Sequence, residues 1–410
     1  MRKAKASNRP VQDDVERKGA SQVRISNQEG GCRPTELQEL LLKAALLQGQ
    51  EAFAAWCEWN RREGLEQLDQ GSLRTLPLVY WNLEKQGFQH PLMGMLRGVR
   101  RRAWYENRLL FRRMAPVIEG LHRAGIPTLL LKGAPLALLY YSDPGLRSMQ
   151  DFDVLVPEAQ ALPAMRLLES QGWKQEGKNG GGFRFRESDL RFRHSIMLSN
   201  RDGVEIDVHW HVLYLASYRG ADRPFWEAGA PLVFEGISTR ALCASDQLLH
   251  ACTHGPMWDP VPPMRWVADA FIVMRSSKID WQRLLMLAER LRIVAPVREG
   301  LEYLATALAA PVPTEVLAAL RRIKVSRPEE LEYQLSSKPW PLLGPIESVL
   351  ATYHIYARCM RGETRLAKLA RLPRYLQCIW RLERPQQLWP EAMRRILQRI
   401  RLMSPRDASP

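Results

Sequence analysis

The chain has 410 residues, of which 46% are hydrophobic and 25% are charged, and it carries a formal net charge of +15 at pH 7. This apolar content excludes a chain that is disordered throughout, and the length predicts two or three globular domains. The excess of basic residues is concentrated in residues 97–113 and 361–401 and favours polyanionic partners, such as nucleic acid, nucleotides or anionic lipid. A solvated, arginine-rich surface explains the same charge equally well.

Membrane-spanning and secretory segments are not expected. The most apolar stretch, residues 126–141, is interrupted by Lys132, Gly133 and Pro135, so it cannot serve as a bilayer-spanning helix. The basic N-terminus has no apolar region after it, and we therefore expect a cytoplasmic protein. Six scattered cysteines without short paired spacings predict reduced thiols and argue against a zinc knuckle.

Patterning along the chain divides it into five segments. We expect a disordered basic tail at 1–33, an N-terminal helical region at 34–123, an α/β core at 124–240, a C-terminal helical domain at 241–403 and a disordered tail at 404–410. The predicted fold class is α+β, with a small mixed sheet flanked by helical regions on both sides.

Helix signals are clearest outside the core. Thr35 followed by Glu36 predicts the capped start of a helix, and residues 96–121 repeat apolar positions at the helical period. After the core, Ser245 and Asp246 predict the cap of a helix that runs through His254.

The core begins with a strand, a glycine turn and a helix. Residues 126–131 read as a buried strand, and residues 136–141 as a short helix after the break that begins at Lys132. Such a turn predicts a phosphate site, because the free backbone N–H groups of Gly133 and Ala134 and the helix dipole face an incoming anion. Lys132 would add a positive charge there.

A second basic group follows the helix. Residues 142–145 (Ser-Asp-Pro-Gly) predict a turn, after which Arg147 and Ser148 lie just ahead of an acidic strand. The planar guanidinium of Arg147 suits phosphate oxygens, so Arg147 and Ser148 are candidates for nucleotide binding.

The acidic strand carries Asp151 and Asp153. Alternate side chains of a strand share a face, so these two carboxylates project together while Phe152, Val154 and Val156 point into a core. Two adjacent carboxylates are unfavourable unless a proton or cation lies between them, and oxygen ligands suit a hard divalent ion such as Mg²⁺.

A third acid lies on a later strand. Residues 200–203 (Asn-Arg-Asp-Gly) predict a hairpin turn after a strand at 191–198, and residues 204–209 alternate apolar and polar positions. We expect Glu205, Asp207 and His209 on the exposed face of that strand. If the hairpin packs beside the Asp151 strand, Asp207 joins the acidic pair, with Glu205 as the alternative. His209 could orient Asp207 or contact the nucleotide, although a polar residue at a strand end is equally ordinary.

These motifs together resemble a known family. The Lys132-Gly133-Ala134 turn, Asp143-Pro144-Gly145, the acidic pair and residues 206–210 (Ile-Asp-Val-His-Trp) resemble the uncharacterised bacterial nucleotidyltransferase family of the DNA polymerase beta superfamily. The resemblance extends through residues 248–255 and 265–269 and covers about residues 110–290. It implies a nucleotidyltransferase core between helical regions that select the acceptor.

The resemblance also implies site roles. Asp151 and Asp153 would bind two Mg²⁺ ions, with Mn²⁺ as the alternative, and Asp207 would be the third carboxylate, nearest the attacking hydroxyl. Lys132 and Gly133 would hold a nucleoside triphosphate that is attacked at its α-phosphorus, with loss of pyrophosphate. Ala134 departs from the Gly or Ser usual at this position, so a hydroxyl contact to phosphate is lost.

Several alternatives remain open at this point. The chain could be a catalytically inactive member of the fold that binds nucleotide or RNA, or a metal-dependent phosphohydrolase or nuclease that uses the same carboxylates. The acceptor could be tRNA, a protein, or a sugar or sugar phosphate. The basic C-terminal helices could contact nucleic acid or an anionic membrane surface. His250 and His254 have the i, i+4 spacing of zinc ligands, but Ala251 follows His250, so packing or contact with the cleft is favoured.

Overall fold

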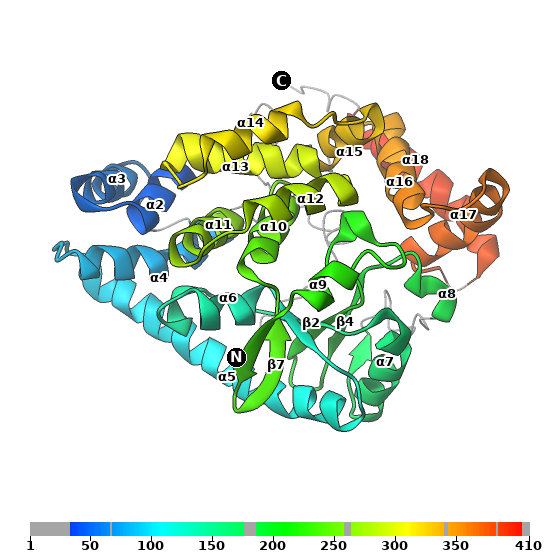
Figure 1. Ribbon diagram of the computed structural model, residues 1–410, viewed down its shortest axis with the longest axis horizontal. Helices are drawn as coiled ribbons and strands as arrows, with labels where there is room; N and C mark the ends of the chain where they lie inside the picture. Colours follow the sequence, from blue (N-terminus) through cyan, green and yellow to red (C-terminus); the bar gives the residue numbers. More distant parts are fainter. Residues whose placement is uncertain are drawn as a thin grey trace, which may run out of the picture.

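The structure is a computed structural model that describes residues 33–65, 68–175, 186–257, 264–339, 343–382 and 384–403. The tails predicted to be disordered and the loop at Gly180–Gly182 lie outside these residues, apart from Arg33. Within the described residues the fold is α+β, as the sequence predicts, with one mixed sheet and many flanking helices (Figure 1).

Seven strands form the sheet in the order β3-β4-β5-β2-β1-β7-β6. Pairing is antiparallel for β1 with β2, β3 with β4, β4 with β5 and β6 with β7, and parallel for β1 with β7 and β2 with β5. The strands are β1 (Leu129–Leu131), β2 (Phe152–Leu155), β3 (Lys174–Gln175), β4 (Ser195–Ser199), β5 (Glu205–His209), β6 (Ala230–Phe234) and β7 (Ile237–Ala241).

The two faces of the sheet belong to two different cores. Phe152, Val154 and Val156 lie in one core, as their alternation predicts, whereas Leu155, from the opposite face of β2, lies in the other. Asp153 shares the face of Leu155 because alternate residues of a strand point the same way. The acids therefore lie on the face that the larger helical core covers.

The N-terminal region is helical. Its helices are α2 (Glu36–Leu46), α3 (Gly49–Arg62), α4 (Gln70–Lys85) and α5 (Met93–Arg123). Thr35 caps α2 as predicted, because its hydroxyl accepts from the N–H of Gln38, whose side chain in turn accepts from the N–H of Thr35. The long α5 runs along one face of the sheet, where Phe111 packs edge-on against Phe234 of β6 (Figure 1).

Further helices follow the core. They are α10 (Ala244–His254), α11 (Met264–Ser276), α12 (Trp281–Leu291), α13 (Val294–Leu308), α14 (Thr314–Arg322), α15 (Arg327–Ser337), α16 (Pro345–Cys359), α17 (Arg365–Ile379) and α18 (Leu388–Met403). One core joins residues of α2–α4 to residues of α10–α14, whereas α16 and α17 share a small separate core around Tyr356 and Tyr375. The domain limits given above stay a prediction.

The expected cap of α10 is wrong. Its N-cap is Cys243, which makes no side-chain capping bond, and Ser245 and Asp246 lie inside the first turn. Both bind α12 and the residue before it: Ser245 Oγ accepts from the N–H of Asp280, and Asp246 accepts two hydrogen bonds of 2.8 Å from Arg283. A sequence pattern typical of capping thus serves here to join two helices.

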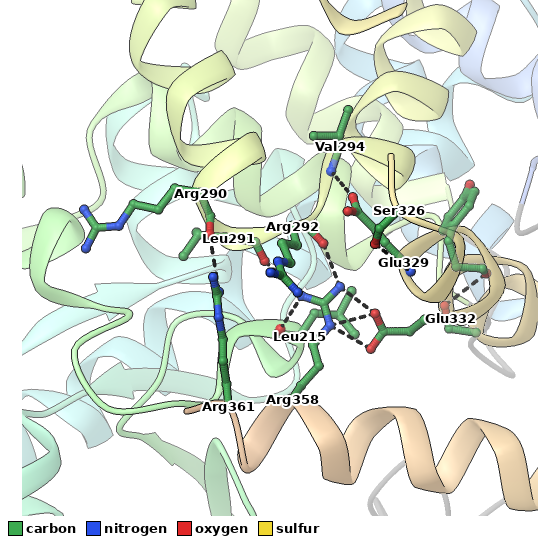
Figure 2. A network of polar contacts seen from close by, with 12 residues as sticks. Leu215, Arg290, Leu291, Arg292, Val294, Ser326, Glu329, Glu332, Arg358 and Arg361 are labelled. Carbon is green, nitrogen blue, oxygen red and sulfur yellow. Dashed lines mark hydrogen bonds and ion pairs between the residues drawn. The ribbon is translucent and has the colours of Figure 1, made fainter. Parts of the chain in front are cut away.

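Polar contacts centred on Arg358 hold α16 against the rest of the molecule (Figure 2). Arg358 donates to the carboxylate of Glu332 and to the carbonyl oxygens of Leu215, Leu291 and Arg292. Both charged side chains are largely buried, at 14% and 7% exposure. A buried guanidinium satisfied by four different acceptors fixes the position of α16 despite its small apolar core.

No helix among the described residues combines the length and the apolar character that a membrane crossing requires. The described cysteines Cys57, Cys243, Cys252, Cys359 and Cys378 are free thiols, whereas Cys32 lies outside the described residues.

Candidate active site

Asp153 and Asp207 lie opposite each other on neighbouring parallel strands. The register pairs Asp153 of β2 with Asp207 of β5, which confirms the assumed packing of the hairpin beside the first acidic strand. The hairpin turn also forms as expected, with Gly203 at a φ of +73° and the side chain of Asn200 accepting from two backbone N–H groups. Glu205 lies at the start of β5, opposite Ser199 of β4, so the structure places Asp207 and not Glu205 against Asp153.

His209 completes a compact cluster with the two acids. Its Nε2 lies 3.1 Å from Asp153 Oδ1 and 2.9 Å from Asp207 Oδ2, and one ligand atom from each residue falls within 4.8 Å of the others. The prediction that Asp207 and His209 lie on an exposed face is wrong, because both are buried. Strand alternation does not reveal that α10 and the segment after β5 cover this face.

Asp151 lies just before β2 and is half-buried. It is not part of the three-residue cluster, but it is close enough for its charge to affect Asp153 and Lys132. Partial burial raises the pKa of the Asp151 carboxyl, and the neighbouring Asp153 carboxylate adds to this rise, against the opposing charges of Lys132 and Arg265. A bound cation would relieve this repulsion.

Lys132 forms the turn between β1 and α6 (Gly133–Leu139) in a strained conformation. Its φ of +49° and ψ of −112° are rarely adopted by residues with a side chain, and strain of this kind costs about 1–3 kcal/mol. The turn brings Lys132 Nζ to 2.6 Å from Asp153 Oδ1. The ammonium predicted to face phosphate therefore contacts the acid cluster directly.

The turn needs a glycine at position 133, because neighbouring atoms already occupy the space that a side chain would fill. An added Cβ at Gly133 would lie 2.7 Å from Met149 Sδ and 3.0 Å from Arg147 Nη1. Ala134, the next residue, is buried in the core beneath the sheet. The backbone of Gly133 is thus in close contact with the segment that leads into the acids.

Arg147 is anchored by a buried ion pair. Its Nε and Nη2 each donate to a carboxylate oxygen of Asp269 at 2.8 Å, and both residues are buried. Two of its nitrogens therefore face α11 and not a phosphate, while Nη1 lies beside Gly133. Ser148 is half-buried next to it. The proposed phosphate contacts of these two residues stay a prediction.

Asn107 of α5 fixes the same segment from the other side. Its Nδ2 donates to the carbonyl oxygens of Pro144 and Arg147 at 2.6 and 2.8 Å, and its Oδ1 accepts from the N–H of Met149 at 3.1 Å. The side chain is fully buried, so these three bonds replace the hydrogen bonds that the amide makes to water in the unfolded chain. Asn107 and Asp269 are positioning residues that sequence reasoning missed. The role of Asn107 could have been predicted from the sequence, because it is a polar residue within the apolar stripe of α5.

Charges in the cluster balance at neutral pH. Burial opposes ionisation of both acids, but Lys132 and His209 hold the pKa of Asp153 well below its usual range and lower that of Asp207 to about 2. Burial likewise opposes protonation of His209, yet the Asp207 carboxylate outweighs it and raises the pKa of His209 to about 9. Two carboxylates therefore face an imidazolium and an ammonium, which supply two positive charges between the acids.

A small pocket adjoins the cluster. Besides Lys132 and His209 it is lined by His194, the segment 212–215, Thr253, His254 and Met257. The rings of His194 and His209 lie 5.4 Å apart, and those of His250 and His254 stack at 5.7 Å. In the described residues the cluster that could hold a metal comprises Asp153, Asp207 and His209, and His250 and His254 do not belong to it. His254 instead contributes to the wall of the pocket.

The donor set fits a divalent cation. Asp153 and Asp207 are in register, Asp151 is a third acid whose pKa is raised by burial and by Asp153, and a bound cation would take the place of the positive charges of Lys132 and protonated His209. His209 Nδ1 is buried and has no hydrogen-bond partner. An imidazole nitrogen suits Mn²⁺ better than Mg²⁺, whereas the oxygens of Asp151, Asp153 and Asp207 suit both.

No curated protein matches the chain. One solved structure that it resembles is an antigenic nucleotidyltransferase-like protein from Paracoccidioides brasiliensis, at 12% identity and a TM-score of 0.33, covering 52% of this chain and 92% of that one. A likeness this weak supports no conclusion here. A family model described as uncharacterised nucleotidyltransferase matches residues 72–309, a span that includes the turn, all three acids and Asp269. Since this match covers more than half of the sequence, the chain belongs to that family of uncharacterised nucleotidyltransferases.

Proposed function

We propose that this chain is a metal-dependent nucleotidyltransferase of the DNA polymerase beta type. It moves a nucleoside monophosphate from a nucleoside triphosphate to a hydroxyl or phosphate of an acceptor and releases pyrophosphate. The observation that carries the proposal is the direct pairing of Asp153 with Asp207 on parallel strands, beside the strained turn at Lys132. Membership of the nucleotidyltransferase family supports the same reaction class.

In this proposal Asp151, Asp153 and Asp207 hold two divalent ions, Mg²⁺ or alternatively Mn²⁺. When bound, such ions stabilise negative charge on the attacking and leaving oxygens of an in-line displacement. The chain's residues supply the ligands and keep them in place: Ser195 Oγ donates to Asp207 Oδ2 at 3.2 Å, and Lys132 and His209 balance the charge of the acids when no ion is bound.

The nucleotide contacts are assigned to the turn that faces the acids. Backbone N–H groups of Gly133 and Ala134, with Arg147 Nη1 and Ser148 beside them, hold the triphosphate, and Lys132 and His209 contribute positive charge. An acceptor oxygen nearest Asp207 forms a bond to the α-phosphorus. The bond from that phosphorus to the bridging oxygen breaks, and pyrophosphate leaves. The acceptor is a tRNA end, a protein or a sugar phosphate, and the reaction takes place in the cytoplasm.

Nucleotide binding and product identity test this proposal. Calorimetry with each of the four nucleoside triphosphates should show binding that depends on Mg²⁺ or Mn²⁺, and incubation with acceptor mixtures should release pyrophosphate. Asp207→Asn should lower the rate of release by roughly 10²–10³-fold. Asp202→Asn, which changes an exposed acid in the hairpin turn, should leave the rate unchanged.

Three outcomes would contradict the proposal in different ways. Absence of binding with any nucleotide and either metal would remove its basis. Release of inorganic phosphate, or shortened nucleic acid, would indicate a phosphohydrolase or nuclease. Nucleotide binding with no pyrophosphate release from extracts of tRNA, protein and sugar phosphates, and no nucleotide mass added to macromolecules in producing cells, would indicate an inactive binder.

A further inference from the structure

The C-terminal helices expose an unusual number of large apolar side chains. In the described residues, more than half of the exposed large hydrophobic side chains lie on α16, α17 and α18. These are Ile346, Val349, Leu350, Tyr353, Leu366, Leu369, Trp389, Met393, Ile396 and Leu397. The three helices contact one another and form one end of the molecule, remote from α2 and α3 (Figure 1). We call these ten side chains the outward apolar face.

On α16 the exposed apolar residues follow the helical period. Ile346, Val349, Leu350 and Tyr353 lie at positions i, i+3, i+4 and i+7, so they form one stripe that points away from the protein. On α17, Leu366 and Leu369 are 80% and 70% exposed. Single exposed hydrophobic residues are common, but repeated stripes on adjacent helices indicate a binding surface.

Helix α18 also leaves large apolar side chains exposed. Trp389, Met393 and Ile396 lie on its exposed side, with Trp389 81% exposed. Its less exposed side instead carries Glu391 and Arg395, which are bonded to each other at 2.8 Å. Arg395 also stacks over the ring of Trp380, 5.2 Å from its centre. The less exposed side also carries Leu388 and Ala392, and Arg394 lies among the apolar residues of the exposed side, so that side is both apolar and basic.

The same helices carry much of the positive charge of the chain. Residues 345–403 contain twelve Lys and Arg against four Glu, a net charge of +8 out of the total of +15. On α17, Arg365 and Lys368 alternate with the exposed Leu366 and Leu369. Exposed leucine and tryptophan side chains alternate with arginine and lysine. Such a face complements a partner whose interior is apolar and whose boundary is anionic.

Charge and side-chain type indicate which kind of partner fits the outward apolar face. A second copy of this chain would bring the same positive charge to the contact, and like charges repel across an interface. Single-stranded nucleic acid would use aromatic stacking, but most of the outward apolar face is aliphatic. An anionic lipid surface satisfies both features at once, because acyl chains accept the aliphatic residues and headgroups pair with the basic ones.

We propose that the outward apolar face of α16–α18 binds the surface of anionic lipid bilayers without crossing them. The helices are held rigidly enough to present it, since Arg374 is paired with the buried Asp189 and Arg193 donates to the carbonyl oxygen of Cys378 at 3.0 Å. Those contacts tie α17 to the segment that precedes β4. The proposal does not depend on the reaction assigned to the acid cluster.

Vesicle flotation of the full-length chain tests this proposal. The protein should float with vesicles of phosphatidylcholine mixed with phosphatidylglycerol and remain at the bottom of the gradient with pure phosphatidylcholine vesicles. The double variant Leu366→Ser, Leu369→Ser and, separately, Trp389→Ser should each partition roughly tenfold or more weakly. Val233→Ser changes a residue of β6 that is 67% exposed outside the C-terminal helices, and it should float like the wild type.

A folding control accompanies each variant, and several results would contradict lipid binding. Each variant replaces an exposed side chain, so its melting temperature should match the wild type, and either variant alone suffices if the other fails to fold. The proposal is overturned if the wild type does not float, or if both variants float as well as it does. It is also overturned if light scattering shows a dimer that the variants dissociate, or if RNA binding and not flotation responds to them.

Discussion

The acid cluster and the C-terminal helices depart from ordinary packing in opposite directions. Around Asp153 and Asp207, charged groups are buried side by side, whereas α16–α18 leave large apolar groups in solvent. Neither arrangement contributes much to stability on its own, because buried ion pairs lose their hydration and apolar surface left in solvent gains nothing on folding. In the two proposals above, each region is completed by something that the chain binds.

The two regions also differ in how they are held. The acid cluster lies over strands that share two large cores, and its neighbours are fixed by Asn107 and by the Arg147–Asp269 pair. The C-terminal helices have a small core and depend on polar contacts such as those of Arg358. We expect changes at the first region to affect the whole protein, and changes at the second to act locally.

The largest effect on stability is expected from Asp269→Leu. This change leaves the buried guanidinium of Arg147 without its carboxylate and also removes the acceptor of the Tyr141 hydroxyl, so it should lower the free energy of unfolding by about 3–5 kcal/mol. The double variant Arg147→Met, Asp269→Leu should recover much of this loss. Urea denaturation of the three proteins measures it, and a loss below about 1 kcal/mol for the single variant would contradict the structural role of the pair.

A smaller and local effect is expected from Arg358→Met. The change leaves Glu332 unpaired and three carbonyl oxygens without their donor, a loss of about 2–3 kcal/mol for hydrogen bonds to a charged group (Figure 2). Hydrogen exchange should show faster exchange in α16 and α17, with β1 and β2 unchanged. Arg361→Met is the matched control, because Arg361 is more exposed and donates to the Tyr218 hydroxyl and the carbonyl oxygen of Arg290 without a carboxylate partner among these contacts. Equal acceleration in the sheet would show that the two regions are not separable.

At the turn itself, Gly133→Ala should cost about 1–3 kcal/mol of stability, because the new Cβ overpacks against Met149 and Arg147. Gly98→Ala is the matched control: Gly98 lies inside α5 with open space around its Cβ position, so the change should be neutral or stabilising by up to about 1 kcal/mol. Thermal unfolding measures both. A similar melting temperature for the two variants would mean that the turn tolerates a side chain.

Local sequence patterns predicted the strands and the hairpin turn that carry the acids of the site. Strand alternation predicted the face that carries Asp207, and the Asn200–Gly203 turn predicted the pairing of β4 with β5, because strand period and hairpin register are set by near neighbours. The packing of β5 beside β2, which places Asp207 against Asp153, was an assumption, because these two strands are far apart in the sequence. The partner of Arg147 could not be found this way, since Asp269 lies 122 residues further along the chain. The burial of His209 was missed for the same reason, because the covering helix α10 comes from a later segment.

The smallest expected effect is on the pH dependence of stability. It is measured by comparing His250, which is buried near the acid cluster, with His354, which is half-buried on α16. Burial, with His254, Lys132 and His209 adding to it and Asp153 opposing it, holds the pKa of His250 well below 6.5, and its Nε2 has no hydrogen-bond partner. Because the folded state keeps His250 neutral while the unfolded chain takes up a proton, stability is full above about pH 6.5 and falls as the pH drops, by up to about 1.4 kcal/mol per pH unit. His250→Leu should therefore reduce the loss of stability between about pH 7 and about pH 5.5 by roughly 1 kcal/mol in urea denaturation.

His354 on α16 is half-buried and its pKa is also lowered, chiefly by burial, so His354→Leu should change this pH dependence less. Equal changes in the two variants would show that the environment of His250 is no less polar than the exposed end of the molecule.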